Sequence, residues 1–439
     1  MTLKKYSAII LFASVAFVMK AQKTIAYLDK DAFYKQGLDM FDKKQFVTAQ
    51  KSFSDFLTLN SSPTILKTDA EYYAAACAIE LFHKDGEYRM REFITNHGES
   101  QKLNSANFYL GKSSFRKKKY DEVIKNLEKV DIYLLSKEDL AELYFKRGYS
   151  YLENKNQEKA RPDEDPFGRA KADFYEIKDV DNKYAHPANY YYSHIAYIEK
   201  NYETALQGFT RLINNETFGT VVPYYITQIY FVQGKFAQVV KDAPALLNDT
   251  SHVQKAGEIN RMIGESYYNL KDYKNALDYL KKTELASGLN TEGNYAIAYC
   301  YYKLNDYINA IINFEKTVEG RDSMVQNSWY HLADCYVKTN AKPRARTAFY
   351  NSYKYNFDKK IAEDALYSFA KLAYELDFSP YNEAVKAFSK YLKEYPDSPR
   401  KDEAYQFLIN VYSTTKNYEK AITSIESLDS QDPAIKATY

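Results

Sequence analysis

Apolar and small residues recur at helical spacing along most of this chain, and one stretch shows the pattern most clearly. Trp329, Leu332 and Tyr336 are three and four residues apart, which places them on one face of a predicted helix. Ala345 and Phe349 follow on the facing side of a second predicted helix. Small residues let the two backbones approach closely, and large ones fill the space beside the contact. We therefore predict a helix hairpin whose apolar face must be covered by further hairpins.

The second-helix part of this pattern recurs along the chain. The alanines at positions 276, 310, 345, 384 and 421 are 34, 35, 39 and 37 residues apart. Each is followed four residues later by a large apolar residue, namely Leu280, Phe314, Phe349, Phe388 and Ile425. Gly and Pro are scarce, at 14 and 11 residues. These features predict an all-α fold of about eleven stacked hairpins between residues 32 and 433.

These motifs resemble the tetratricopeptide repeat, whose signature is W-x2-L-G-x2-Y followed by A-x3-F. The stretch from Trp329 to Phe349 matches this signature, with Ala333 in place of Gly. The resemblance covers nearly all of the chain after residue 31. It implies a right-handed α-solenoid in which the first helix of each pair lines a concave groove.

Three repeats depart from the pattern. Between about residues 68 and 97 the expected second-helix alanine is missing, so the register there stays open. The sixth repeat has Val239 and Ala243 where Ala and Phe are expected, which predicts a splayed pair. The fourth repeat is interrupted near residues 161–169 by two prolines and an acidic cluster, a composition typical of a surface loop. Such an insertion is either a tolerated bulge or a contact site.

The first residues have the features of a secretory signal peptide. Residues 1–21 combine Lys4 and Lys5, an apolar run from Ala8 to Met19, and Ala21 before the expected cleavage point. The apolar run is short for a membrane span, and no cysteine marks a lipoprotein. We therefore expect a periplasmic protein that begins near residue 22, with a linker over residues 22–31.

At the C-terminal end, the sequence of residues 434–439 predicts the start of a helix that is not completed. A solenoid needs a cover over its last apolar face. Either a longer natural polypeptide or a partner would supply that cover.

Charge and cysteine content exclude several classes of protein. The formal net charge is +2, from 60 basic and 58 acidic residues, and removal of three leader lysines leaves 57 against 58. This balance lacks the excess of basic residues that is typical of proteins that bind nucleic acid. The densest basic run, residues 116–119, falls in a predicted turn between two helices. Cys77, Cys300 and Cys335 form no disulfide framework, so we expect them to be packing residues.

No pattern of catalytic residues emerges. The six histidines are dispersed, and neither a zinc-protease helix motif nor a glycine-rich nucleotide loop is present. We expect no enzymatic activity, no metal and no cofactor.

The most informative feature is an aromatic stripe among the 45 tyrosines. The resemblance implies that residues one and five beyond the signature tryptophan position face the groove, and seven of nine at the first position are aromatic. Rings repeated in this way would present apolar faces together with hydroxyls for peptide amides. The predicted protein-binding groove comprises Tyr190, His194, Tyr197, Tyr224, Phe231, Tyr268, Tyr295, Tyr299, Tyr302, Tyr330, Asp334 and Tyr367.

Two interpretations of the stripe stay open, because tyrosines can also fill the space between adjacent first helices without any ligand. Our main hypothesis is a scaffold that binds a protein or an extended peptide segment, in envelope assembly or secretion. The groove lacks the repeated Lys and Asn with which chaperone adaptors of this family hold a terminal carboxylate. The alternative is glycan binding, as in outer-membrane sugar-binding proteins rich in these repeats. Those proteins normally carry a lipidated cysteine and large insertions, and this chain has neither.

Overall fold

The computed structural model describes residues 29, 31–156, 165–376 and 382–426, and every regular element within these ranges is helical. The predicted leader (1–21), most of the linker (22–31) and the predicted C-terminal helix start (434–439) lie outside the described residues. The chain divides into two units, Met1–Phe218 and Gly219–Tyr439. Each unit is a stack of helix hairpins, which confirms the predicted all-α solenoid class.

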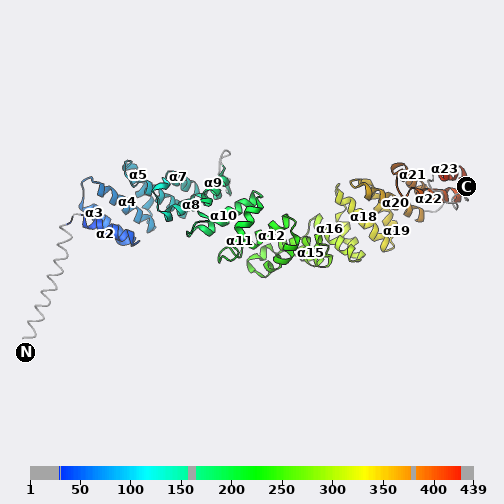
Figure 1. Ribbon diagram of the computed structural model, residues 1–439, viewed down its shortest axis with the longest axis horizontal. Coiled ribbons are helices and arrows are strands. Elements are labelled where there is room, and N and C mark those ends of the chain that lie inside the picture. Colours follow the sequence, from blue (N-terminus) through cyan, green and yellow to red (C-terminus); the bar gives the residue numbers. More distant parts are fainter. Residues whose placement is uncertain (1–28, 30, 157–164, 377–381, 427–439) are drawn as a thin grey trace, which may run out of the picture. The chain divides into compact units, whose positions relative to one another are not determined.

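The N-terminal unit contains five hairpins in the described residues, and they follow one another in chain order (Figure 1). Its elements are α2 (Ala32–Asp42), α3 (Phe46–Leu59), α4 (Ile65–Glu80), α5 (Gly86–Asn96), α6 (Leu103–Arg116), α7 (Tyr120–Leu127), the 3₁₀ turn η1 (Ile132–Leu134), α8 (Lys137–Asn156), α9 (Pro166–Ile177), α10 (Ala185–Ile198) and α11 (Tyr202–Arg211).

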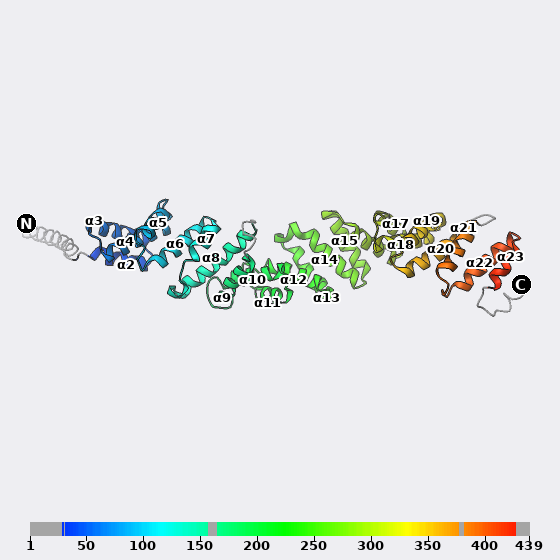
Figure 2. The same ribbon diagram turned by 90° about the horizontal axis from the view of Figure 1, so that it is seen from above.

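The C-terminal unit contains six hairpins in the described residues, again in chain order (Figure 2). Its elements are α12 (Val222–Val232), α13 (Phe236–Asp242), η2 (Ala243–Asn248), η3 (Thr250–Lys255), α14 (Ala256–Asn269), α15 (Tyr273–Ser287), α16 (Thr291–Lys303), α17 (Tyr307–Phe314), η4 (Glu315–Thr317), α18 (Ser323–Lys338), α19 (Lys342–Tyr355), α20 (Lys359–Leu376), α21 (Asn382–Glu394), α22 (Lys401–Thr414) and α23 (Tyr418–Glu426).

A left-handed residue closes the tight turn inside most hairpins. In the turn between α16 and α17, Asn305 has φ 62°. Its N–H donates to the carbonyl oxygen of Tyr302 at 3.0 Å, and the N–H of Asp306 donates to that of Tyr301 at 2.9 Å. These two bonds satisfy carbonyls that the helix end leaves without partners. Lys, Asn or Gly occupies the equivalent left-handed position in seven further tight turns, at Lys44, Lys118, Lys200, Gly234, Lys271, Asn340 and Lys416, and Phe82 occupies it between α4 and α5.

Close contact between a small residue and a large one holds each hairpin together, as the spacing predicts. A Cβ added to Gly111 would lie 2.3 Å from the Leu127 side chain, so any larger residue there would displace that side chain. In a later repeat Ala310 and Phe314 are both 0% exposed. Burying such side chains supplies most of the stability of a hairpin stack.

The structure resolves the two irregular registers. In the second hairpin Gly86 replaces the missing alanine: a Cβ there would lie 2.9 Å from the backbone of Ala78. Met90, four residues later, is fully buried. In the sixth hairpin α13 has only 7 residues and continues as 3₁₀ turns, and Val239 and Ala243 are both 0% exposed.

The loop predicted near residues 161–169 ends earlier than its composition indicates, because α9 begins at Pro166. Residues 161–164 lie outside the described part of the chain. The Asp165 carboxylate accepts a hydrogen bond from the N–H of Gly168 at 2.9 Å, and Pro166 lies in the first turn of α9. Residues 165–168 therefore start a helix instead of forming the predicted loop, because an acidic cap and an early proline favour a helix N-terminus.

The three cysteines are free thiols inside the hairpin stacks. Burial raises the pKa of each thiol to about 12, and in Cys77 and Cys335 a neighbouring carboxylate adds to this effect. Such thiols are unreactive, which agrees with the predicted packing role. Within the described residues, no helix combines the length and the apolar character needed to cross a membrane.

Replacing Ala310 with leucine is expected to lower the free energy of unfolding by about 1–3 kcal/mol, because its site against the first helix has no room for a larger side chain. Urea unfolding of the purified chain measures this change. Ile308 lies on the same helix and is 66% exposed, so Ile308→Leu serves as the control. An unchanged midpoint for Ala310→Leu would show that the hairpin register is wrong.

Candidate binding surface on the first helices

The first helices of successive hairpins lie against one another within each unit. In the C-terminal unit α12 contacts α14, α14 contacts α16, α16 contacts α18, and α18 contacts α20. In the N-terminal unit α2, α4, α6 and α8 are arranged in the same way. Side chains repeated at equivalent positions of these helices therefore become neighbours. We call the surface that they form the first-helix face.

A continuous group of rings lies on this face across α14, α16 and α18. Its centre is Tyr299, whose ring centroid lies 5.8 Å from that of Tyr268 and 5.1 Å from that of His331. The remaining members each lie within 6.1 Å of Tyr299 or His331. We call this group the central aromatic cluster; it consists of Tyr268, Tyr295, Tyr299, Tyr302, Tyr330 and His331. It brings together five of the twelve residues predicted for the groove, and Asp334 adjoins it.

The predicted groove residues are packed between helices, and part of most of them is still accessible. Ten of the twelve side chains are half-buried, and none is classed as exposed. Tyr224 and Tyr367 are nearly sealed, at 5% exposure each. Three of the ring pairs in the cluster meet edge to face, an arrangement that aromatic pairs prefer. The rings therefore hold neighbouring first helices together and stay partly exposed.

Tyrosine hydroxyls on this face donate hydrogen bonds to carboxylates on the next first helix. Tyr302 donates to Asp334 Oδ2 at 2.8 Å, and Tyr330 donates to Asp364 Oδ2 at 2.5 Å. The same arrangement joins α12 to α14, where Tyr224 donates to Glu258 Oε2 at 2.5 Å. The sequence-based hypothesis assigned these hydroxyls to peptide amides. The structure corrects this: their protons are committed within the protein, and only the oxygen lone pairs stay open to a ligand N–H.

These bonds persist over the whole physiological pH range. Burial raises the pKa of Tyr302, and the hydrogen bond to Asp334 raises it further. Burial and the bond to Asp364 act in the same way on the pKa of Tyr330. Both hydroxyls therefore stay protonated and continue to donate.

His331 belongs to the cluster, and the sequence did not indicate it. Its ring stacks on Phe314 at a centroid distance of 5.8 Å, and it lies 5.0 Å from Tyr302. Its Nδ1 atom is buried and has no hydrogen-bond partner. Burial lowers the pKa of His331 to about 4; Asp334 raises it and Lys303 lowers it. The only sequence signal was its position next to Tyr330, which no motif distinguishes.

The other predicted residues form separate groups. In the N-terminal unit Tyr190 stacks on Phe218 at 4.7 Å and on His194 at 6.0 Å, and Tyr197 lies 6.5 Å from His194. In the C-terminal unit Tyr224 and Phe231 lie on α12, and Tyr367 packs on Phe388 and Tyr391. These residues lie outside the central aromatic cluster.

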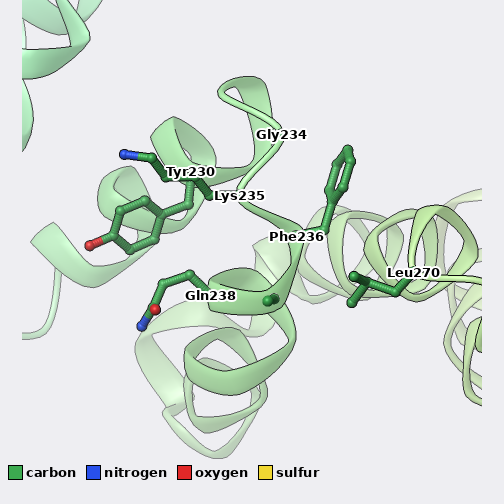
Figure 3. Close-up of a pocket in the computed structure, with 7 residues that line it drawn as sticks. Tyr230, Gly234, Lys235, Phe236, Gln238 and Leu270 are labelled. Atoms are coloured by element: carbon green, nitrogen blue, oxygen red, sulfur yellow. The ribbon is translucent and has the colours of Figure 1, made fainter.

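A hollow opens beside the irregular sixth hairpin, with a volume of about 550 Å³. Figure 3 shows Tyr230, Lys235 and Gln238 on one side of it and Phe236 and Leu270 on the other. Phe236 also packs edge to face against the predicted groove residue Phe231, at 6.1 Å. The hollow is lined by the end of α12, the turn that follows it, the start of α13, and Leu270 at the end of α14.

The stack of hairpins and the continuous face of first helices define a helical-repeat protein. Two family models, each described as a tetratricopeptide repeat, match residues 291–319 and 364–398. These ranges cover most of the hairpins α16–α17 and α20–α21. The chain therefore contains tetratricopeptide repeats.

Several solved structures resemble the chain. YrrB, described as a TPR protein with an unusual peptide-binding site, is 16% identical with a TM-score of 0.36, over 46% of this chain and 97% of YrrB. The C-terminal part of a TPR protein from Cytophaga hutchinsonii is 15% identical with a TM-score of 0.34, over 64% and 98%. The TPR domain of P58(IPK) is 14% identical with a TM-score of 0.26, over 84% and 100%. These values are too low to bear on function. A search of curated proteins found no match.

Proposed function

We propose that the chain is a scaffold that binds an extended segment of another protein on the first-helix face of its C-terminal unit. The observation that carries this proposal is the central aromatic cluster. Its half-buried rings come from three consecutive first helices, α14, α16 and α18. An extended segment can contact several repeats at once, because equivalent positions recur from helix to helix.

The chemistry of the face suits a peptide backbone. Apolar side chains of the segment would pack against the ring edges and exclude water from the contact. Peptide N–H groups would donate to the carboxylates of Asp334 and Asp364 or to the tyrosine oxygens, which already donate their own protons. Asp364 Oδ1 also pairs with Arg400 Nη1 at 2.5 Å, so the remaining carboxylate and tyrosine oxygens are the acceptors that this face offers to backbone N–H groups.

The glycan alternative needs a different geometry. Sugar rings stack on open aromatic faces, whereas Tyr268 and Tyr299 meet edge to face with an interplanar angle of 66°. Tyr295 and Tyr299 stack on each other, with an angle of 17° between their planes. Because the rings of the cluster pack against one another in these ways, we favour a protein segment as the ligand.

The cellular location of the scaffold rests on the leader-like composition of residues 1–21 alone. We propose that the protein acts in the periplasm, in envelope assembly or secretion. Subcellular fractionation of cells that express the full chain tests this part. Recovery of the processed protein with cytoplasmic markers would contradict it.

A peptide library displayed on phage tests the binding function directly. We expect the purified chain to enrich peptides whose affinity falls at least about tenfold in Tyr299→Leu, because this change removes the central ring but keeps an apolar side chain. Tyr133 is 91% exposed and lies in the N-terminal unit, so Tyr133→Leu is the matched control. Circular dichroism of both variants verifies the fold. Selection that enriches no peptide, or equal binding to Tyr299→Leu, would refute the proposal.

A further inference from the structure

A compact cluster of charged side chains lies on three consecutive first helices of the N-terminal unit. Lys112 of α6 has its Nζ 3.1 Å from Glu80 Oε1 of α4 and 3.9 Å from Glu142 Oε2 of α8. Lys146 Nζ lies 2.6 Å from Glu142 Oε1. Arg116 Nη1 lies 3.6 Å from Glu80 Oε2. We call Lys112, Arg116 and Lys146, together with these two glutamates, the cationic cluster.

The cluster carries one positive charge more than its own carboxylates can balance. Three cations share two glutamates, and their side chains are only 11% exposed for Lys146, 16% for Lys112 and 26% for Arg116. A charge removed from water in this way is costly unless an opposite charge compensates it. The charge of a fully exposed lysine, by contrast, is stabilised by water and dissolved ions.

The pKa shifts of Lys146 and Glu142 indicate the same excess of positive charge. Burial lowers the pKa of Lys146, and the attraction of Glu142 does not fully offset this. Burial alone would raise the pKa of Glu142, but the charges of Lys146 and Lys112 outweigh burial and lower it. The positive field therefore dominates the site, and a further carboxylate would be stabilised there.

Arg116 has hydrogen-bonding capacity to spare. Its Nη2 atom is buried and has no hydrogen-bond partner, and its ion pair with Glu80 is long at 3.6 Å. A guanidinium prefers two parallel hydrogen bonds to one carboxylate. The chain itself does not use this nitrogen, which is sealed from solvent. A ligand would reach the guanidinium through the part of the side chain that is exposed.

Phe82 lies next to this guanidinium and is exceptional among the hairpin turns. Its φ is 59°, in the left-handed region where the other hairpin turns have Lys, Asn or Gly. Its ring is 76% exposed, and the Arg116 guanidinium carbon lies 4.8 Å from the ring centroid. A bulky residue in this conformation is strained, and such strain concentrates at functional sites.

We propose that the cationic cluster is a subsite for an aspartate or glutamate side chain within an extended acidic segment of a partner protein. The carboxylate would accept hydrogen bonds from Arg116 and neutralise the excess charge, and an apolar neighbour in the segment would pack on Phe82. This inference rests on the proposed function, since it names the chemistry of a segment that the scaffold binds. It adds a charged specificity element in the N-terminal unit.

Two fluorescent peptides with capped ends test the subsite. One alternates glutamate with leucine and the other glutamine with leucine, so they differ only in charge, and neither has a terminal carboxylate. Fluorescence anisotropy with the full chain should show at least about tenfold tighter binding of the glutamate peptide, and added salt should reduce this difference. Arg116→Gln should abolish the preference.

The matched control is Arg344→Gln. Arg344 also pairs with a glutamate, at 2.5 Å from Glu315, and stacks 4.3 Å from the Tyr336 ring, but in the C-terminal unit. This variant should keep the preference for glutamate. Lys112→Met is a second test variant and should also reduce the preference, should Arg116→Gln fail to fold by circular dichroism.

Equal binding of the two peptides would overturn the acidic subsite and leave the proposed function intact, because apolar contacts alone would then hold the segment. An unchanged preference in the folded Arg116→Gln or Lys112→Met variant would also overturn it. So would the absence of measurable binding of the glutamate peptide. Loss of the proposed function would appear separately, as failure of the phage selection.

Discussion

Replacing Arg147 with methionine is expected to destabilise the N-terminal unit by about 3–5 kcal/mol at neutral pH. Arg147 of α8 donates two hydrogen bonds to Asp173 of α9, from Nε at 2.9 Å and from Nη2 at 2.7 Å. Asp173 is only 5% exposed. Methionine would leave this buried carboxylate without its partner, and the desolvation cost of the charge would remain.

The pH dependence of this variant identifies the cause. Burial raises the pKa of Asp173 above the ordinary value of 3.8, and Arg147 opposes this effect. Without Arg147 the pKa rises further, so the variant should regain stability as the pH falls toward 3.8, where the carboxyl group becomes neutral. Urea unfolding at several pH values measures this. The double variant Arg147→Met with Asp173→Asn should lose less stability than the single one; equal losses would mean that the ion pair is not the cause.

Lowering the pH from 6.5 to about 4 is expected to destabilise the C-terminal unit by about 3 kcal/mol through His331 alone. The folded pKa of His331 lies below the unfolded value, so the unfolded chain takes up a proton first as the pH falls. The stabilisation is complete above pH 6.5 and is lost progressively toward pH 4. Protonation would place a charge among Tyr299, Tyr302 and Phe314, where burial disfavours it.

His331→Phe separates this effect from the titration of other groups. Phenylalanine keeps the stack on Phe314 and removes the buried Nδ1 atom that has no partner. We expect this variant to be as stable as the natural chain at neutral pH and clearly more stable near pH 4. Unfolding followed by the single tryptophan, Trp329, reports on the same helix α18. Identical pH profiles for the two proteins would contradict the assignment.

The fold was largely predictable because its rules are local. Spacing between small and large residues, such as Ala310 and Phe314, sets each hairpin, and a hairpin contacts only its neighbours. One register was left open and one helix start was assigned wrongly. Gly86 replaces an alanine because its helix lies close to the Ala78 backbone, and no sequence pattern indicates this contact. Pro166 and Asp165 were assigned to a loop although they form a typical helix start.

The site was less predictable, because its key contacts join different repeats. The stripe placed Tyr302 and Tyr330 on one face, but their bonds to Asp334 and Asp364 depend on how consecutive first helices align. The cationic cluster illustrates the same difficulty. Arg116 lies at the start of the run 116–119, which the sequence assigned to a solvated turn, and only the packing of α4, α6 and α8 places it beside Glu80.

Photo-crosslinking of a selected peptide to the full chain tests the binding surface most directly. A peptide from the phage selection, carrying a photoreactive residue, is irradiated with the chain, and mass spectrometry locates the crosslinks. We predict crosslinks on α16 and α18, around Tyr299 and Tyr330, and their loss in Tyr299→Leu. Crosslinks confined to the second helices α15, α17 and α19 would contradict binding on the first-helix face.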